Sequence, residues 1–289
     1  MQKFFALYNK TLRAGLMGLK NNFLPQQNTR MKEADEIMEN PLGVHEYLRA
    51  MESDYGLAYT LILSKLSRVL RFEEEGTALE VGCGPCILTA KMASAFPKTK
   101  WLGIDGSDAM LALAEKRIRE EGMVNLGVKK MHSDEIQTLP ESFDVILLSL
   151  MLHHAQDEEA AVRLINDCVR KLKPGGTLLI FDFVRPKTDA IALWICDTYI
   201  HARGSLLYND SLASLRAAFT FPELTRILER SEFENYEHAR DLLNLYQFVC
   251  TKAPHHPPRS IQSKTIVSRL ALLWYRALFF GKMSSRAPR

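Results

Sequence analysis

The run Leu79-Glu80-Val81-Gly82-Cys83-Gly84-Pro85-Cys86 decides the fold of this chain. It begins as a short apolar stretch typical of a buried strand, and a segment with apolar residues at helical spacing follows it. A glycine-rich turn between a strand and a helix lets a ligand approach the backbone closely, with helix N–H groups facing it. The run therefore predicts a nucleotide-type site where the first strand of an α/β domain ends.

Two kinds of nucleotide-type ligand are bound by glycine turns of this type. A dinucleotide fingerprint G-x-G-x-x-G needs glycine at position 87, where this chain has Ile87, so that interpretation fails. An acid-x-G-x-G turn remains, with a second acid, Asp105, at the end of the next apolar run. A carboxylate there can accept hydrogen bonds from both hydroxyls of a ribose.

Outward from this turn, apolar runs alternate with helical segments. The expected strands are 77–81, 100–105, 125–132, 143–149 and 177–183, the expected helices are 88–96, 108–121, 158–172 and 221–234, and a closing hairpin is expected at 236–243 and 246–251. Near-continuous apolar strands are typical of parallel sheets that are buried on both faces. The fold class is therefore α/β, a mostly parallel sheet with helices on both faces, preceded by a long helical pattern at 44–70.

Four motifs in this order resemble those of the class I S-adenosylmethionine-dependent methyltransferases. They are Glu80-Val-Gly-Cys-Gly-Pro, Gly103-Ile-Asp-Gly-Ser, Phe143-Asp-Val-Ile-Leu-Leu-Ser-Leu-Met-Leu-His-His154 and Leu172-Lys-Pro-Gly-Gly-Thr-Leu-Leu-Ile180. The resemblance covers roughly residues 44–252. It implies a Rossmann-like sheet of seven strands with an antiparallel last strand, and S-adenosyl-L-methionine as the cofactor.

The resemblance also implies which residues bind that cofactor. Glu80, Gly82, Cys83 and Gly84 would hold its methionine end, Asp105 and Gly106 its ribose, Met110 would pack on the adenine, Asp134 and Glu135 would reach the adenine edge, and Ser149 with the backbone after it would line the sulfonium. We expect no bound metal.

One position departs from the pattern, because the family usually has glycine where this chain has Cys86. The substitution creates Cys83-Gly-Pro-Cys86, which matches the redox tetrapeptide of thioredoxins and also lies between a strand and a helix. A thioredoxin interpretation leaves Asp105, the turn at 174–176 and most of the chain unexplained.

Catalytic residues are harder to predict than the cofactor site. The candidates for a general base are His154, Asp197 and His201. His153 and His154 can instead cap a loop and pack. The insertion at 185–219 either forms the acceptor pocket, because ligands bind outside the carboxyl ends of parallel strands, or is an ordinary helical insertion.

Composition places the chain among soluble globular proteins. It has 289 residues, 47% of them hydrophobic and 25% charged, and only five cysteines, which suggests a reducing compartment. No apolar stretch reaches the ~20 residues of a membrane span, and no secretory signal is legible. We therefore expect a cytoplasmic protein.

Charge is unevenly distributed along the chain. All 34 acids lie between Glu33 and Asp241, while residues 1–32 carry only basic charges, as do residues 242–289. Both ends also show apolar faces at helical spacing, which is typical of helices that lie on an anionic membrane surface. They can equally form a lid on the acidic body, and residues 1–32 can also be read as a mitochondrial presequence.

The expected organisation is a basic amphipathic extension (1–43), a methyltransferase domain (44–253) and a basic amphipathic tail (254–289). The expected function is methyl transfer to a small, apolar or lipid-like acceptor, with peripheral attachment to a membrane. The alternatives are a non-catalytic cofactor-binding or scaffold protein and a nucleic-acid methyltransferase. Nucleic acid is the less favoured partner, because the body is acidic and no Asn/Asp-Pro-Pro-Tyr/Phe sequence follows strand 143–149.

Overall fold

The structure is a computed structural model, and it describes residues 17–18, 20–33, 48, 75–200, 203–241, 244–252 and 284–285. The helices expected at 44–70 and 261–282 and most of the one expected at 1–24 lie outside these residues. Among the described residues, no helix is long and apolar enough to span a membrane.

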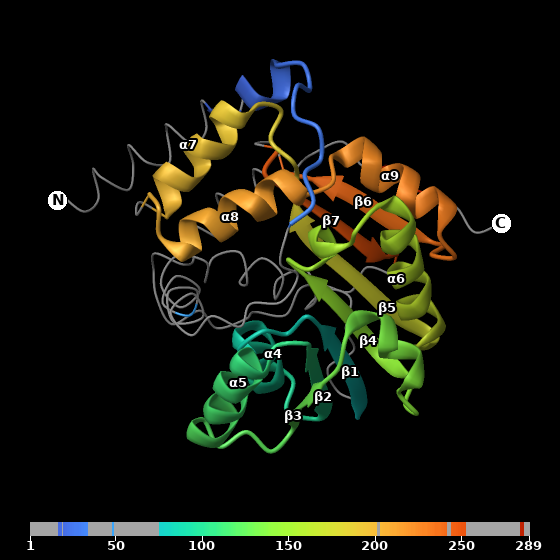
Figure 1. The fold of residues 1–289 in the computed structure, drawn as a ribbon. Coiled ribbons are helices and arrows are strands. Elements are labelled where there is room, and N and C mark those ends of the chain that lie inside the picture. Colours follow the sequence, from blue (N-terminus) through green and yellow to red (C-terminus); the bar gives the residue numbers. More distant parts are fainter. Residues whose placement is uncertain are drawn as a thin grey trace, which may run out of the picture.

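A single sheet organises the described chain (Figure 1). Its strand order is β3-β2-β1-β4-β5-β7-β6-β8. Strands β1 to β5 pair in parallel, β7 runs antiparallel to both β5 and β6, and β8 pairs antiparallel with β6. The strands are β1 (Gly76–Val81), β2 (Thr99–Asp105), β3 (Leu126–Lys130), β4 (Phe143–Ser149), β5 (Leu172–Phe183), β6 (Tyr236–Arg240), β7 (Tyr246–Thr251) and β8 (Ser284–Ser285).

The expected Rossmann-like sheet of seven strands with an antiparallel last strand is thereby confirmed, and the two-residue β8 is an addition to it. The chain winds outward from β1 to β3, then returns to β4 on the other side of β1. This reversal opens the crevice in which α/β sheets bind ligands, at the carboxyl ends of β1 and β4.

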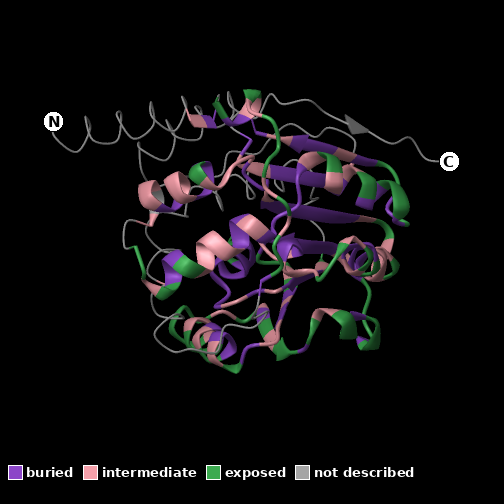
Figure 2. Ribbon diagram, turned by 45° about the horizontal axis from the view of Figure 1, so that its top comes forward, coloured by how far each residue is buried: buried purple, intermediate pink, exposed green. Residues whose placement is uncertain are grey.

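Helices cover both faces of the sheet. On one face, α4 (Ile87–Ala95) and α5 (Asp108–Glu120) pack with the sheet through a core cluster that includes Leu88, Leu111 and Leu147. On the other face, α6 (Glu158–Arg170) and α9 (Phe221–Arg230) pack through a second cluster. Figure 2 shows the consequence, with the strands largely buried and the exposed residues on outer helix surfaces and loops.

Two further helices, α7 (Asp189–Tyr199) and α8 (Leu206–Ala217), form the insertion and lie beyond the carboxyl end of β5 (Figure 1). A small apolar cluster with Tyr208 and Leu215 at its centre joins them to Phe183. The sequence predicted an insertion here but not its division into two helices.

The N-terminal segment, which we define as residues 20–33, crosses the same end of the sheet. Its backbone is hydrogen-bonded to Lys187, just before α7, and to Arg216 in α8. The buried side chain of Asn21 donates to the carbonyl of Asn244 at 3.1 Å. This described part of the predicted extension therefore packs on the methyltransferase-like body.

The structure corrects several element boundaries. The helix expected at 221–234 ends at Arg230, and the strand expected at 236–243 ends at Arg240. The strand expected at 177–183 begins at Leu172, because residues 173–176 bulge out of the β4–β5 ladder instead of ending it. Phe143 pairs with Leu172, and Val145 already pairs with Thr177. Gly175, with a φ of +76°, allows this bulge.

Candidate active site

The glycine turn after β1 has an unusual backbone. Gly82 has a φ of +70°, Gly84 of +52° and Cys86 of +55°, so three of five consecutive residues are left-handed. A Cβ at Gly82 would lie 2.5 Å from Cγ of Met151, whereas a Cβ at Gly84 would meet nothing within 4 Å. Packing therefore requires glycine at position 82, whereas a Cβ at position 84 would extend into free space. Left-handed backbone at Cys86 costs about 1–2 kcal/mol, which explains why glycine suits that position.

Asp105 ties this turn to the end of β2. Its Oδ2 accepts from the backbone N–H of Gly84 at 2.8 Å, and its Oδ1 accepts from that of Ser107 at 2.9 Å. Ser107 in turn caps α5 by accepting from the N–H of Met110 at 3.1 Å. Each carboxylate oxygen keeps a lone pair for a further donor, such as a ribose hydroxyl.

Glu80 is the second-last residue of β1 and precedes Gly82 of the glycine turn by two positions. Its side chain is buried and accepts a hydrogen bond from the hydroxyl of Thr89 in α4. Burial raises the pKa of Glu80 to about 8, with a smaller contribution from the negative charge of Asp105. A cationic ligand group nearby would shift this balance toward the carboxylate.

Cys83 and Cys86 are both buried and both free. The hydrogen bond between them and burial raise the pKa of the Cys83 thiol well above its usual value. A redox-active cysteine needs a lowered pKa, so the thioredoxin interpretation has no support here. The two sulfurs instead fill the space beside Gly103, where a Cβ would lie 2.7 Å from Cys83 Sγ.

The remaining predicted cofactor residues follow the ends of β2, β3 and β4. Gly106 and Met110 follow β2, and the side chain of Met110 is buried. Asp134 and Glu135 belong to the short helix η1 (Ser133–Thr138) after β3, where Glu135 caps the helix through the N–H of His132 at 2.8 Å.

Ser149 ends β4 and supplies a test of whether a cofactor fits. Its hydroxyl oxygen is buried and has no hydrogen-bond partner among the described residues. The next residue, Leu150, is left-handed at a φ of +51°, which is strained for a residue with a side chain. An orphaned hydroxyl at the end of β4, the strand that pairs with β1, fits a polar ligand at the junction of these two strands.

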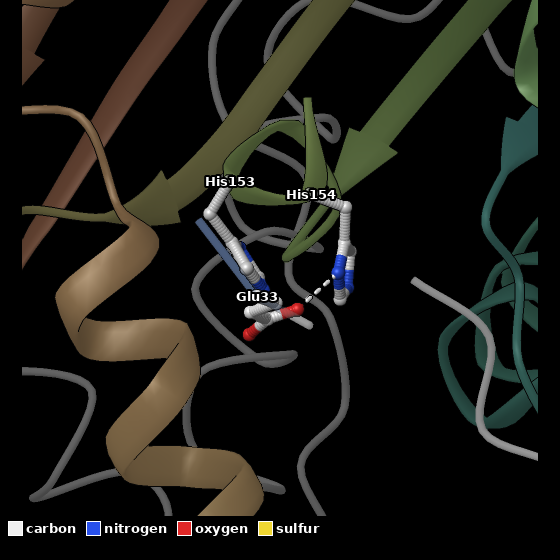
Figure 3. A group of neighbouring side chains, drawn as sticks. All are labelled: Glu33, His153 and His154. Atoms are coloured by element: carbon white, nitrogen blue, oxygen red, sulfur yellow. Dashed lines mark ion pairs between the residues drawn. The ribbon is translucent and has the colours of Figure 1, made fainter. Parts of the chain in front are cut away.

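A second group of polar residues lies beside the end of β4. The short helix η2 (Leu152–His154) carries His153 and His154, and the N-terminal segment brings Glu33 to them. Glu33 Oε2 lies 2.5 Å from His154 Nδ1, and the two imidazole centroids are 4.3 Å apart. Figure 3 shows both rings pointing toward the Glu33 carboxylate.

Asp182, near the end of β5, holds His153 from the other side. One carboxylate oxygen contacts His153 Nδ1 at 2.7 Å, and the other accepts from the His153 backbone N–H at 2.9 Å. Burial alone would lower the pKa of His153, but the charge and hydrogen bond of Asp182 raise it above its usual value. Burial raises the pKa of the neighbouring Asp210, in α8, to about 6.

Arg30 fixes the N-terminal segment over this group. Its guanidinium donates to the carbonyls of His153 (2.8 Å), Ala155, Gln156 (2.9 Å) and Ala217 (2.6 Å). It also stacks over the ring of Phe219 at 4.2 Å. Glu33 therefore reaches the histidines from a segment that is anchored three residues earlier.

The three candidate bases have different surroundings. His154 lies at the end of β4, and 31% of its side chain is exposed. Asp197, in α7, forms an ion pair with Arg203 and accepts from the hydroxyl of Tyr208 at 2.9 Å, and these partners lower its pKa to about 2. His201 lies outside the described residues. Of the two candidates among the described residues, His154 follows the end of β4, and Asp197 is engaged by Arg203 and Tyr208.

The sequence missed Glu33, Arg30 and Asp182. Asp182 could have been found, because parallel neighbours end together and Ser149 pairs with Phe181. Glu33 and Arg30 belong to no motif, and they reach the site only through tertiary contacts across more than 100 residues.

The site combines a Rossmann-like sheet with a glycine turn whose backbone N–H is bound by Asp105, and it lacks the dinucleotide fingerprint. This combination is typical of proteins that bind a nucleotide-type cofactor other than a dinucleotide. Comparisons with known proteins narrow the class further. Residues 78–176 match the family described as a methyltransferase domain. The ubiquinone/menaquinone biosynthesis C-methyltransferase UbiE of Shewanella halifaxensis is 28% identical over 177 residues, which cover 56% of this chain and 69% of that protein. A ubiquinone biosynthesis O-methyltransferase of Methylococcus capsulatus is 36% identical over 102 residues, which cover 35% of this chain and 40% of that protein.

Solved structures agree on the fold. The plantazolicin methyltransferase BamL, in complex with a triazolic desmethylPZN analog and SAH, superposes with a TM-score of 0.54 at 18% identity, covering 81% of this chain and 79% of that one. Together these findings support a class I S-adenosylmethionine-dependent methyltransferase with S-adenosyl-L-methionine as its cofactor, and the family match itself lies in residues 78–176.

Proposed function

We propose that this protein transfers a methyl group from S-adenosylmethionine to a small, apolar or lipid-like acceptor. The observation that carries the proposal is the glycine turn held by Asp105 at the reversal of strand order, next to the orphaned hydroxyl of Ser149. The predicted cofactor residues lie at or after the carboxyl ends of β1 to β4, as a single bound cofactor requires.

The cofactor supplies an electrophilic methyl group on a sulfonium, and the protein aligns the acceptor with it. In this proposal Asp105 accepts from the ribose, the N–H groups of the glycine turn face the ligand, and Glu80 lies near its methionine end. The acceptor approaches from the side of η2, α7 and α8, where His154 is exposed.

An apolar acceptor is supported by two features. The insertion packs aromatic and aliphatic residues around Phe183 at the carboxyl end of β5. Two relatives are named for ubiquinone or menaquinone biosynthesis, and quinones are small conjugated ring compounds without ionisable groups.

The test uses purified full-length protein and S-adenosylmethionine labelled in the methyl group. We expect label to enter an organic-solvent extract of small molecules, with a product ~14 Da heavier than its precursor. Label in RNA or DNA would overturn the acceptor class. Tight SAH binding by calorimetry without any transfer would instead support a non-catalytic binding protein.

A further inference from the structure

Three side chains from two distant parts of the chain converge beside the end of β4. Glu33 comes from the N-terminal segment, and His153 and His154 come from η2. Each offers one oxygen or nitrogen ligand atom, and these atoms all lie within 4.8 Å of one another. Two imidazoles and one carboxylate form a donor set that suits divalent transition metals.

Two atoms of this group lack a hydrogen-bond partner. Glu33 Oε1 and His154 Nδ1 are both buried, and no described residue satisfies either of them. Glu33 Oε2 forms a 2.5 Å ion pair with His154 Nδ1; burial by itself would raise the pKa of Glu33, but its interactions with His154 and Ser214 lower it. Because only 4% of the Glu33 side chain is exposed, water is a poor substitute partner, and leaving a buried carboxylate oxygen unsatisfied is costly.

Asp182 forms the hydrogen bond to His153 that metal-bound histidines usually make with their second ring nitrogen. It holds His153 Nδ1 at 2.7 Å, which leaves Nε2 of the same ring for another partner. In zinc sites, a carboxylate commonly fixes the tautomer and orientation of a metal-bound histidine in this way, without binding the metal itself.

The distances require only small adjustments. Bonds of about 2.0–2.2 Å in a tetrahedral site place ligand atoms roughly 3.3 Å apart. The Glu33 Oε2–His154 Nδ1 pair, at 2.5 Å, would open by less than ~1 Å, and the other separations, none of them above 4.8 Å, would close by at most about 1.5 Å.

The charges around the group also favour a cation. Three carboxylates, those of Glu33, Asp182 and Asp210, interact with the two histidines. The guanidinium of Arg30, in the same segment as Glu33, is engaged by backbone carbonyls and the Phe219 ring. A bound cation would therefore lie beside these carboxylates.

We propose that Glu33, His153 and His154 bind one divalent transition-metal ion of the Zn²⁺ type, with Asp182 as the positioning residue for His153. His154 is then a metal ligand and not a free base. The partial exposure of His154 leaves a fourth position open toward the acceptor side. If the proposed function holds, that position suits an acceptor hydroxyl, whose pKa a metal lowers so that it loses its proton to water before the methyl group is attacked.

The test measures metal binding alone, so it does not depend on turnover. Full-length protein is stripped with a chelator, desalted and titrated calorimetrically with ZnCl₂, and with MgCl₂ for comparison. We expect one Zn²⁺ per chain at micromolar affinity or tighter, and no comparable Mg²⁺ binding. Glu33→Gln and His154→Ala should each weaken Zn²⁺ binding at least tenfold, and Asp182→Asn by about 10- to 100-fold.

Matched variants separate this site from other zinc-binding groups. His255→Ala/His256→Ala removes two histidines outside the described residues, and Glu159→Gln removes an exposed glutamate that pairs with Arg230. Both should keep wild-type Zn²⁺ affinity. Circular dichroism confirms folding, and His154→Gln replaces His154→Ala if the latter unfolds.

Three results would overturn the proposal. They are Zn²⁺ binding weaker than micromolar, binding that survives Glu33→Gln and His154→Ala, and binding lost on replacing His255 and His256 or the buried cysteines. SAH affinity of the metal-free protein, measured in parallel, reports separately on the proposed function.

Discussion

Asp105 contributes to the cofactor site in two ways, because the same carboxylate shapes the glycine turn and faces the crevice. We predict that Asp105→Ala lowers SAH affinity at least tenfold. Hydrogen bonds to a charged group contribute about 1.5–3 kcal/mol, and about 1.4 kcal/mol is a factor of ten in affinity. Calorimetric titration with SAH measures this.

Asp108→Ala is the matched control, since Asp108 lies three residues away, exposed, in an ion pair with Lys130. It should leave SAH affinity within about threefold of wild type. Equal affinity of the Asp105 and Asp108 variants would remove the ribose-binding role from Asp105.

Glu80 links the stability of the cofactor-free protein to pH. Its pKa of about 8 in the folded protein lies above the ordinary value, because burial favours the neutral acid. The folded state therefore holds a proton that the unfolded state has lost, and the free energy of unfolding falls as pH rises from about 4.5 to 8. One such group contributes a slope of about 1.4 kcal/mol per pH unit.

We predict that Glu80→Gln removes this slope. Urea unfolding of wild type and variant across this pH range should give a stability difference that grows in favour of the variant toward pH 8. Parallel curves for the two proteins would show that Glu80 is ionised throughout.

Arg30 links the N-terminal segment to the body, because it donates to four backbone carbonyls of η2, the loop after η2 and α8. We predict that Arg30→Met lowers the free energy of unfolding by about 1.5–3 kcal/mol, since four carbonyls lose a charged donor. Urea unfolding measures the change. Lys20→Met, at an exposed position of the same segment, should change stability by less than about 0.5 kcal/mol.

The sequence predicted the elements that form from local patterns. Apolar runs and the glycine turn give β1 to β5 and their helices, since burial on both faces leaves a continuous apolar signal. The predicted start of β5 was wrong, because the strand begins at Leu172. Residues 173–176 have the composition of a turn, but in the structure they form a bulge within the β4–β5 pairing. The sequence also failed for Glu33, whose role depends on a segment folding back across the sheet.

At the scale of the whole molecule, the basic ends still need a partner. We propose that residues 1–24 and 261–282 dock on anionic membrane. Phe23 is one of the apolar residues in the basic N-terminal stretch, and its side chain is 87% exposed. A body of net negative charge with basic apolar ends would be held at such a surface with its crevice near a lipid-soluble acceptor.

Liposome co-sedimentation checks this. Binding should require anionic lipid and weaken with salt, because charges are screened over ~8 Å at physiological ionic strength. Lys3→Gln/Lys10→Gln/Arg13→Gln keeps the apolar face and should reduce binding while leaving SAH affinity unchanged. Failure to sediment with anionic vesicles at low salt would favour the lid interpretation.

The short strand β8 has a consequence for how copies of this protein meet. Ser284 and Ser285 pair with His238 and Glu237, so these two residues cover part of the outer side of β6. An uncovered edge strand presents a row of unpaired N–H and C=O groups on which another chain can add a strand. Ser284 and Ser285 thus protect this part of the edge against the addition of another strand, and a truncation before Ser284 would remove that protection together with Arg286 and Arg289.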